Sequence, residues 1–281
     1  MSVRPLLAAA LQADGLDPAA VERVIRTALD EDLAFGPDVT TESTVPADAV
    51  ATGDVTPRSV GVLAGGAAVE VLVHEADGAV TEPELPVLTV TGPTRSLLTA
   101  ERTALNLVCH LSGIASLTRQ WADAIEGTDA AVRDTRKTTP GLRALEKYAV
   151  RRGGGVNHRM GLGDAALVKD NHVAAAGGIA AAVAAVRTTA PDIPREVECD
   201  TLVQVREAID AGVQLVLLDN FSTADTRTAV DLVRGTGVRL EASGGLDLPR
   251  AAEVAATGVD YLAVGALTHS APVLDLGFDL R

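Results

Sequence analysis

The sequence predicts an α/β protein in which a small α/β layer domain precedes a shortened β/α barrel. At 281 residues, the chain is long for one ordinary domain and short for three. From residue 130 onward, short apolar strands alternate with helical segments rich in Ala, Val and Leu, which is the pattern of parallel β/α units. Residues 50–95 instead carry β-rich stretches that are broken by Gly and Pro.

In the second part, nearly every expected strand ends in a residue that is capable of chemistry. The six strands are Ala130–Arg133, Ala165–Lys169, Glu196–Cys199, Leu215–Leu218, Val238–Ala242 and Tyr261–Val264. The carboxyl ends of barrel strands converge on one mouth, so this recurrence predicts an active site there. Six strands rather than eight favour a shortened barrel, with a doubly wound open sheet as the alternative.

The first part begins with helices and ends with a long one. Asp17 and Pro18 are the expected N-cap and first residue of a helix, and Arg4–Leu11 fits a short helix better than a signal peptide. Strands are expected near residues 52–56, 60–63 and 87–91, with a helical run near 67–75. A long helical pattern covers residues 97–126, with a break at Gly113.

Composition argues against several classes of partner. Hydrophobic residues make up 47% of the chain but aromatic residues only 2%, which disfavours stacking on nucleic-acid bases. The net charge of −14 argues against general affinity for nucleic acid or anionic membranes. No apolar run approaches the roughly 20 residues that span a bilayer. We therefore expect a cytoplasmic protein in which Cys109 and Cys199 are reduced.

One window of the sequence reverses the overall charge. Between Arg133 and Lys169 there are nine Lys or Arg residues against three acidic ones, a net charge of +6, whereas the rest of the chain carries −20. All three lysines of the chain lie in this window. A small anionic ligand would account for the charge, and a solvated basic helix face is the alternative.

Within that window, five side chains are candidates for contact with an anion. Arg136 and Lys137 follow a strand end, His158 and Arg159 follow a glycine-rich loop, and Lys169 ends the next strand. Arginine holds a carboxylate through two hydrogen bonds, whereas lysine supplies a point charge. Several cations around one pocket predict a ligand with more than one carboxylate. Taken alone, His158 would be read as a structural histidine.

Two carboxylates should face the same mouth. Glu198 and Asp219 come from consecutive strand ends, where they could bind Mg²⁺ carried by a diphosphate, hold ribose hydroxyls or stabilise a cationic transition state. The alternative is that they pair with the cations of the pocket. Glu196 and Asp200 share a strand face with Glu198, so spacing alone does not choose among the three.

Two late loops have the features of a phosphate site. Ser243–Gly245 follows one strand and precedes Asp247, an expected N-cap, and Gly265 ends the next strand with His269 shortly after. Glycines let backbone N–H groups approach a phosphate, and two successive late loops form such sites in barrels. The Ser-Gly-Gly motif alone is equally compatible with a plain turn.

Together these motifs resemble the quinolinate phosphoribosyltransferase family. The resemblance runs from about Asp30 to near the end of the chain, and it rests on ERTALN at 101–106, RDTRKTTPGLR at 133–143, KYAVRRGGGVNHR at 147–159, LVKDNH at 167–172, residues 196–200, LLDN at 217–220, EASGGL at 241–246 and DYLAVGALTHS at 260–270.

The resemblance implies a fold and an assembly. It implies an N-terminal α/β sandwich at residues 1–107, an incomplete barrel of about six strands at 108–268, and a tail at 269–281 that returns to the first domain. It also implies a homodimer in which Arg102 enters the active site of the neighbouring subunit. The substrates would be quinolinate and phosphoribosyl pyrophosphate, with Mg²⁺ as cofactor.

The resemblance also implies a role for each candidate residue. Quinolinate would be held by Arg102, Arg136, His158, Arg159 and Lys169. Phosphoribosyl pyrophosphate would be bound by Lys137, Glu198, Asp219, Ser243, Gly244, Gly265 and His269. Lys137, Lys169, Glu198 and Asp219 would be catalytic, and Glu198 and Asp219 would also meet the metal of Mg²⁺-diphosphate. The alternatives are a same-fold enzyme that uses nicotinate without decarboxylation and a non-catalytic anion-binding paralogue.

Overall fold

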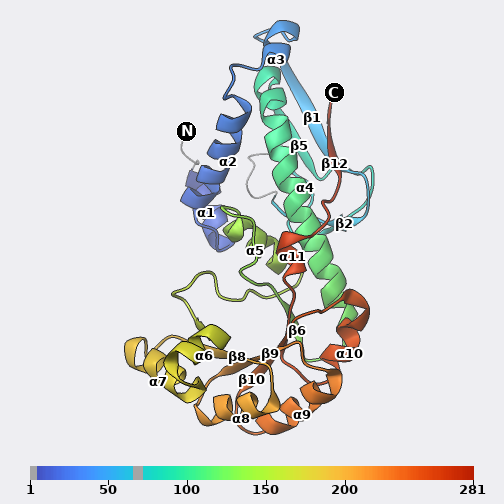
Figure 1. The fold of residues 1–281 in the computed structure, drawn as a ribbon. Coiled ribbons are helices and arrows are strands. Elements are labelled where there is room, and N and C mark those ends of the chain that lie inside the picture. The colour runs from blue at the N-terminus through green and yellow to red at the C-terminus, as the bar shows by residue number, and fades with distance from the viewer. Residues whose placement is uncertain (1–4, 66–71) are drawn as a thin grey trace. The chain divides into compact units, whose positions relative to one another are not determined.

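The structure is a computed structural model that describes residues 5–65 and 72–281 (Figure 1). It divides into two compact units. Unit 1 comprises the described parts of Met1–Arg119, Thr138–Gly154 and Ala266–Arg281. Unit 2 comprises Gln120–Lys137 and Gly155–Gly265.

Unit 2 is built on a parallel sheet of six described strands. These are β6 (Ala131–Arg133), β7 (Ala166–Val168), β8 (Arg195–Cys199), β9 (Leu215–Asp219), β10 (Arg239–Ser243) and β11 (Tyr261–Ala263). Their order is β6-β11-β10-β9-β8-β7, so β7 to β11 are sequential neighbours and the first strand pairs with the last. A doubly wound sheet reverses its strand order at a switch point. The sequential order described here confirms the incomplete barrel and excludes the open-sheet alternative.

Helices follow the strands of unit 2 and lie along the outside of the sheet (Figure 1). They are α6 (Asp170–Ala176), α7 (Ile179–Thr189), α8 (Leu202–Asp210), α9 (Thr223–Val233), the 3₁₀ turn η2 (Leu248–Arg250) and α10 (Ala251–Ala255). Thr201, Ser222 and Asp247 each accept a hydrogen bond from a backbone N–H in the first turn of the following helix. Because these caps lie two to four residues after a strand, the connections are short.

Unit 1 combines helices with two antiparallel sheets. Its helices are α1 (Pro5–Ala13), α2 (Pro18–Asp32), α3 (Val39–Thr44), α4 (Thr94–Ala124, whose last turn extends past the unit boundary), α5 (Arg143–Arg152) and α11 (Ala266–His269). Its strands are β1 (Val50–Pro57), β2 (Gly61–Val62), β3 (Leu72–Val73), β4 (Val80–Thr81), β5 (Leu88–Pro93) and β12 (Leu276–Leu280). One sheet has the order β12-β1-β5-β3, and β2 pairs with β4. Asp17 caps α2 by accepting from the N–H of Ala19 at 3.0 Å, which confirms the cap.

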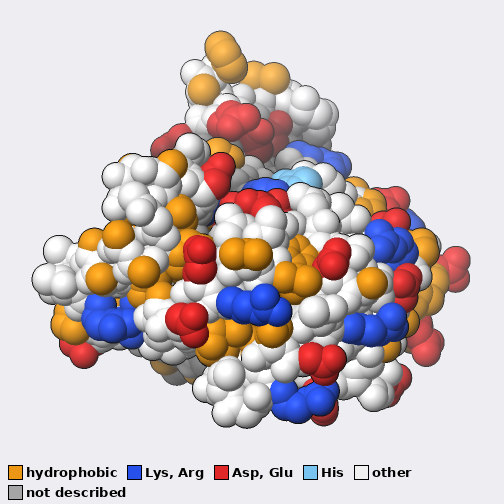
Figure 2. Space-filling model, turned by 60° about the horizontal axis from the view of Figure 1, so that its bottom comes forward, with side chains coloured by type: hydrophobic (Ala, Val, Ile, Leu, Met, Phe, Trp, Pro, Cys, Tyr) orange, Lys and Arg blue, Asp and Glu red, His pale blue; other side chains and the backbone are white. Residues whose placement is uncertain are grey.

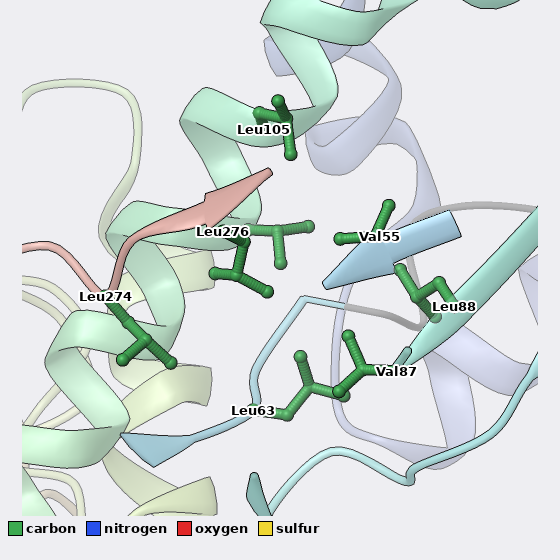
Figure 3. Close-up of a cluster of buried hydrophobic side chains, with 8 residues drawn as sticks. Val55, Leu63, Val87, Leu88, Leu105, Leu274 and Leu276 are labelled. Atoms are coloured by element: carbon green, nitrogen blue, oxygen red, sulfur yellow. The ribbon is translucent and has the colours of Figure 1, made fainter. Parts of the chain in front are cut away.

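The core of unit 1 joins segments that are far apart in the sequence. Figure 3 shows Val55, Leu88, Leu105 and Leu276 converging from β1, β5, α4 and β12. Burial of one such leucine contributes roughly 1.5–3 kcal/mol. Residues near the C-terminus are therefore part of this core, and β12 pairs with β1 along its whole length.

Two expectations for unit 1 are wrong. The helical run near 67–75 lies partly outside the described residues, and Leu72 and Val73 form β3, which pairs with β5. Pairing with an existing strand edge outweighs a weak helical period there. The break expected at Gly113 is also absent, since α4 continues through it. Because Gly113 has no side chain, the carbonyl oxygen of Pro272 can lie close to the helix. A Cβ atom added at position 113 would be only 2.1 Å from that oxygen.

Gly113→Ala should therefore lower stability, although the same change in an open helix gains about 1 kcal/mol. We expect a loss of about 1–3 kcal/mol because the backbone near Pro272 must move. Gly92→Ala is the matched control, since its nearest neighbour, Leu97, is 3.7 Å from the added Cβ. Denaturant titrations of both variants test this, and equal or higher stability of Gly113→Ala would contradict the packing role.

The surface and the helices agree with the charge and hydropathy of the sequence. On the face shown in Figure 2, Lys and Arg side chains lie singly among acidic and apolar ones. Within the described residues, no single helix has the length and apolar composition of a membrane span. The helices α6 and α7 reach that length and composition only together, and they are bent by 88° relative to each other.

Cys109 and Cys199 are both free, as expected.

Candidate active site

A pocket of about 420 Å³ opens at the carboxyl ends of the strands of unit 2. Its lining residues come from the ends of β7 to β11 and from the segments after β6, and they are Thr135, Arg136, Lys137, His158, Arg159, Leu167, Lys169, Glu198, Leu217, Asp219, Glu241, Ser243 and Ala263. Parallel strands place their carboxyl ends at one edge, which explains why residues more than 100 positions apart meet here.

The structure brings together eight of the residues that the sequence proposes for the site. These are Arg136, Lys137, His158, Arg159, Lys169, Glu198, Asp219 and Ser243. Gly244 and Gly265 follow β10 and β11 in the same unit. Arg102 and His269 belong to unit 1, where the Arg102 side chain on α4 is 66% exposed and Nδ1 of His269 lies 2.6 Å from Oγ of Ser270.

Arg136 and Arg159 place two guanidinium groups in the lining of the pocket. The Nε–H group of each is buried and has no acceptor among the described residues. Burial, with Arg136 as the next cause, lowers the pKa of Arg159 from its ordinary value. Two guanidinium groups close enough to repel each other, each with an unused N–H, are suited to an anion with two acceptor groups.

Lys169 and Glu198 form an ion pair across neighbouring strand ends. The Lys169 side chain is 46% exposed and the Glu198 side chain 17%, so the lysine lies closer to solvent. The sequence analysis left open, as an alternative, that Glu198 pairs with a cation of the pocket in this way. Asp200, which spacing could not separate from Glu198, is exposed and does not line this pocket, and Glu196 is buried.

Asp219 is held by its neighbour, a contact that the sequence reading did not anticipate. Nδ2 of Asn220 donates to Oδ2 of Asp219 at 2.8 Å, and the N–H of Asn220 donates to the carbonyl of Ser243 at 2.9 Å. Asn220 has a left-handed backbone with φ of 55°, which Asn adopts more readily than most residues. A Cβ at Gly244 would lie 2.3 Å from Oδ1 of Asn220, so this glycine is required for the packing.

A buried polar cluster of Arg133, His158, Glu196 and Glu241 adjoins the pocket. His158 Nε2 lies 3.0 Å from Oε2 of Glu196 and 3.5 Å from Oε1 of Glu241, and Arg133 Nη1 donates to Oε2 of Glu241 at 2.6 Å. Nδ1 of His158 accepts from the N–H of Arg159 at 2.7 Å. Both ring nitrogens of His158 are therefore in contact with described residues.

The sequence analysis left Glu196 open as an alternative to Glu198 and assigned no role to Glu241 or Arg133. A usable signal was present, because Glu196 and Glu241 stand two positions before Glu198 and Ser243 and so share their inward strand face. Charged residues within apolar strands need partners, which predicts a buried network. The remaining cations of the basic window lie on α5 in unit 1, where Arg151 donates to the carbonyl of Asp14 at 2.7 Å and Arg152 pairs with the Asp14 side chain.

Burial and the neighbouring Glu196 raise the pKa of Glu241 from its ordinary 4.5 to about 7, against the opposing effects of His158 and Arg133. Between those two pH values the folded state holds a proton that the unfolded state releases. The contribution of Glu241 to stability is therefore fully present below pH 4.5 and falls as pH rises to about 7.

Glu241→Gln should remove this pH dependence, because the amide keeps the shape of a protonated carboxyl group and does not ionise. Relative to the wild type, the variant should gain up to about 3 kcal/mol of stability as pH rises across that window. Denaturant titrations of both proteins at several pH values between 4.5 and 8 measure the difference. A difference in stability that stays constant over this range would show that Glu241 is ionised throughout.

Two family models match the chain almost end to end. The quinolinate phosphoribosyl transferase N-terminal domain matches residues 38–112, and the C-terminal domain of the same family matches residues 114–279. The chain belongs to the quinolinate phosphoribosyl transferase family. The C-terminal match includes every residue that lines the pocket.

Individual relatives agree with this family. The chain is 54% identical, over 93% of its length and 97% of the relative, to the nicotinate-nucleotide pyrophosphorylase (carboxylating) of Mycobacterium leprae. It is 38% identical to the probable enzyme of that name from Bacillus subtilis, over 89% of this chain and 90% of the relative. The crystal structure of NadC from Streptococcus pyogenes is similar with a TM-score of 0.89 and 39% identity, covering 95% of this chain and 98% of that one.

Proposed function

We propose that this chain transfers the phosphoribosyl group of phosphoribosyl pyrophosphate to quinolinate and releases diphosphate and CO₂. The product would be nicotinate mononucleotide, in de novo NAD biosynthesis. The observation that carries the proposal is that four cations, Arg136, Lys137, Arg159 and Lys169, line one pocket together with the carboxylates of Glu198 and Asp219. Membership of the family supports the same reaction.

Quinolinate would bind through its two adjacent carboxylates. Arg136 and Arg159 supply planar donors that suit carboxylates, while Lys169 adds a point charge that is shared with Glu198. His158 completes the proposed set of quinolinate contacts in this unit. The ring nitrogen, which lies next to one of these carboxylates, would then face the sugar.

Phosphoribosyl pyrophosphate would lie along the carboxylate side of the pocket. We assign Lys137 to the diphosphate, Glu198 and Asp219 to the ribose and the metal, and Ser243, Gly244, Gly265 and His269 to the 5′-phosphate. Glu198 and Asp219 offer the oxygen donors that Mg²⁺ prefers, and one carboxylate from each strand leaves positions for diphosphate oxygens and water. When bound, the metal would neutralise the charge that develops on the leaving diphosphate.

The chemistry makes modest demands on the protein. The pyridine nitrogen attacks the anomeric carbon as the bond to diphosphate breaks, through an oxocarbenium-like state that nearby carboxylates stabilise. The carboxylate next to the cationic ring nitrogen then leaves as CO₂. Its electron pair stays on the ring carbon, which takes up a proton. The residues of the pocket would orient the ring, balance charge and limit water.

A turnover assay tests this proposal. With quinolinate labelled at the carboxylate next to the ring nitrogen, phosphoribosyl pyrophosphate and Mg²⁺, labelled CO₂ and diphosphate should appear in equal amounts, and chelation of Mg²⁺ should stop both. Nicotinate should give no CO₂ and little diphosphate. Equal turnover of nicotinate and quinolinate would favour the non-decarboxylating enzyme of the same fold, and no turnover of either would favour the anion-binding paralogue.

Two variants locate the reaction in the pocket. Lys169→Ala should lower kcat/KM for quinolinate by about 100-fold, since a lost charge-assisted contact costs roughly 1.5–3 kcal/mol. Arg227→Ala removes an exposed cation on α9, away from the pocket lining, and should leave kcat/KM within about twofold.

The proposal extends to a homodimer in the cytoplasm. The Arg102 side chain is 66% exposed on unit 1 and lies no closer than 3.9 Å to its ion-pair partner Glu101, which suits a residue that serves the site of a second subunit. The two free cysteines suit the cytoplasm, because that compartment is reducing. Fractionation of the producing cells would test this location.

Subunit mixing tests the shared site. Arg102→Ala and Lys169→Ala should each be nearly inactive alone, and a mixed dimer should regain activity because one of its two sites keeps both native residues. Tagged subunits and native mass spectrometry would establish that mixing has occurred. Mixed dimers that stay inactive would contradict the proposal that Arg102 acts in trans.

A further inference from the structure

The buried polar cluster forms a second layer of the barrel interior, one step along the strands from the proposed catalytic carboxylates. Glu241 is fully buried, and Glu196 and His158 are 4% and 7% exposed. One oxygen of each carboxylate and one nitrogen of His158 lie within 4.8 Å of one another. None of the proposed steps of the reaction uses either glutamate.

The hydrogen bonds of this layer leave one oxygen of each carboxylate without a hydrogen-bond donor among the described residues. Oε2 of Glu241 accepts from Arg133, and Oε2 of Glu196 lies at Nε2 of His158. Oε1 of Glu196 and Oε1 of Glu241 are both buried and accept no hydrogen bond from any described residue. A proton on either of these oxygens would remove one buried negative charge and give that carboxyl group a donor in place of an unpaired acceptor.

The charges around Glu241 favour such a proton. Arg133 faces it from β6, His158 from the loop after Gly155, and Glu196 from β8. On the neighbouring strands, the residues in register with Glu241 are Leu217 of β9 and Tyr261 of β11, and Arg133 stacks on the Tyr261 ring at 4.6 Å. Two ionised carboxylates against one arginine would leave a buried negative charge next to a pocket for anions.

We propose that Glu241 is a positioning residue that carries a proton toward Glu196, and that this proton keeps the layer neutral so that the pocket binds a dianionic ring acid. The inference rests on the proposed function for the identity of that acid. When the proton leaves, the added negative charge opposes the cations that hold the substrate. Affinity for the substrate therefore falls as pH rises through neutrality.

A divalent metal ion is the competing occupant of the same three side chains. Glutamate and histidine are metal ligands, but Arg133 already places a guanidinium nitrogen 2.6 Å from Glu241. A divalent ion at this position would add positive charge next to the guanidinium group of Arg133. A proton on a carboxylate would only neutralise one negative charge. Elemental analysis of the purified protein that found one bound metal ion, lost in Glu241→Gln, would overturn the proposal.

Infrared spectroscopy of the full chain tests for the proton without any substrate. The wild type at pH 6 should show the carbonyl stretch of a buried protonated carboxyl group, and this band should be absent at pH 8. Glu241→Gln should lack the band at both pH values, and Glu207→Gln, an exposed change on α8, should keep it. Glu196→Gln removes the repelling charge but keeps the burial of Glu241, so the band should disappear at a lower pH than in the wild type. A band that persists in Glu241→Gln would refute the proposal.

Calorimetric titration with quinolinate tests the consequence. For the wild type and Glu207→Gln, Kd should rise about three- to tenfold from pH 6 to pH 8, the size expected for one added charge near the ligand. For Glu241→Gln it should change by less than about twofold, since the amide remains neutral. The same rise in Glu241→Gln would assign the pH dependence to another group, such as His158, and overturn the role of Glu241. Failure of every protein to bind quinolinate would count against the proposed function, while the infrared band would still decide the location of the proton.

Discussion

The pocket of unit 2 depends on the parallel register of its strands. Ser243 pairs with Asp219 across β10 and β9, and Glu241 and Glu198 both pair with Leu217. This register places a ring of polar residues at the strand ends and a second, buried set two positions earlier. A slip of one residue in this register would turn these side chains to the face covered by helices. The position of the reactive groups therefore depends directly on the pairing of the strands.

Charge balance explains how an acidic protein builds a site for anions. The chain carries −14 overall, yet its pocket gathers Arg136, Lys137, Arg159 and Lys169 from three chain segments. Inside the site, Glu198 forms an ion pair with one of these cations, Lys169. Arg136 also contributes, after burial, to the lowered pKa of Arg159, so a bound carboxylate would relieve a repulsion between the two guanidinium groups.

Much of the fold and of the pocket could be predicted because both follow simple periodic rules. The alternation of apolar strands and helices in the sequence predicted the barrel. Reactive residues at the expected strand ends and in the loops beside them predicted eight residues of the pocket lining. The roles of these residues, and the contribution of Arg102 to a second subunit, came from the family resemblance and stay predictions. The buried layer was missed because Glu241 and Glu196 lie inside apolar strands, where each polar residue depends on partners contributed by distant segments. Gly113 and β3 were misread because their conformations are set by Pro272 and by the edge of β5, which local sequence does not specify.

The central claim is that the pocket recognises a ring bearing two carboxylates, and the most direct test compares the affinity of the full chain for quinolinate and for nicotinate by calorimetry at pH 6. We predict saturable binding of quinolinate with a Kd about 100-fold below that of nicotinate, because the second carboxylate engages a guanidinium group that nicotinate leaves unpaired. Equal affinity for the two acids would contradict the account.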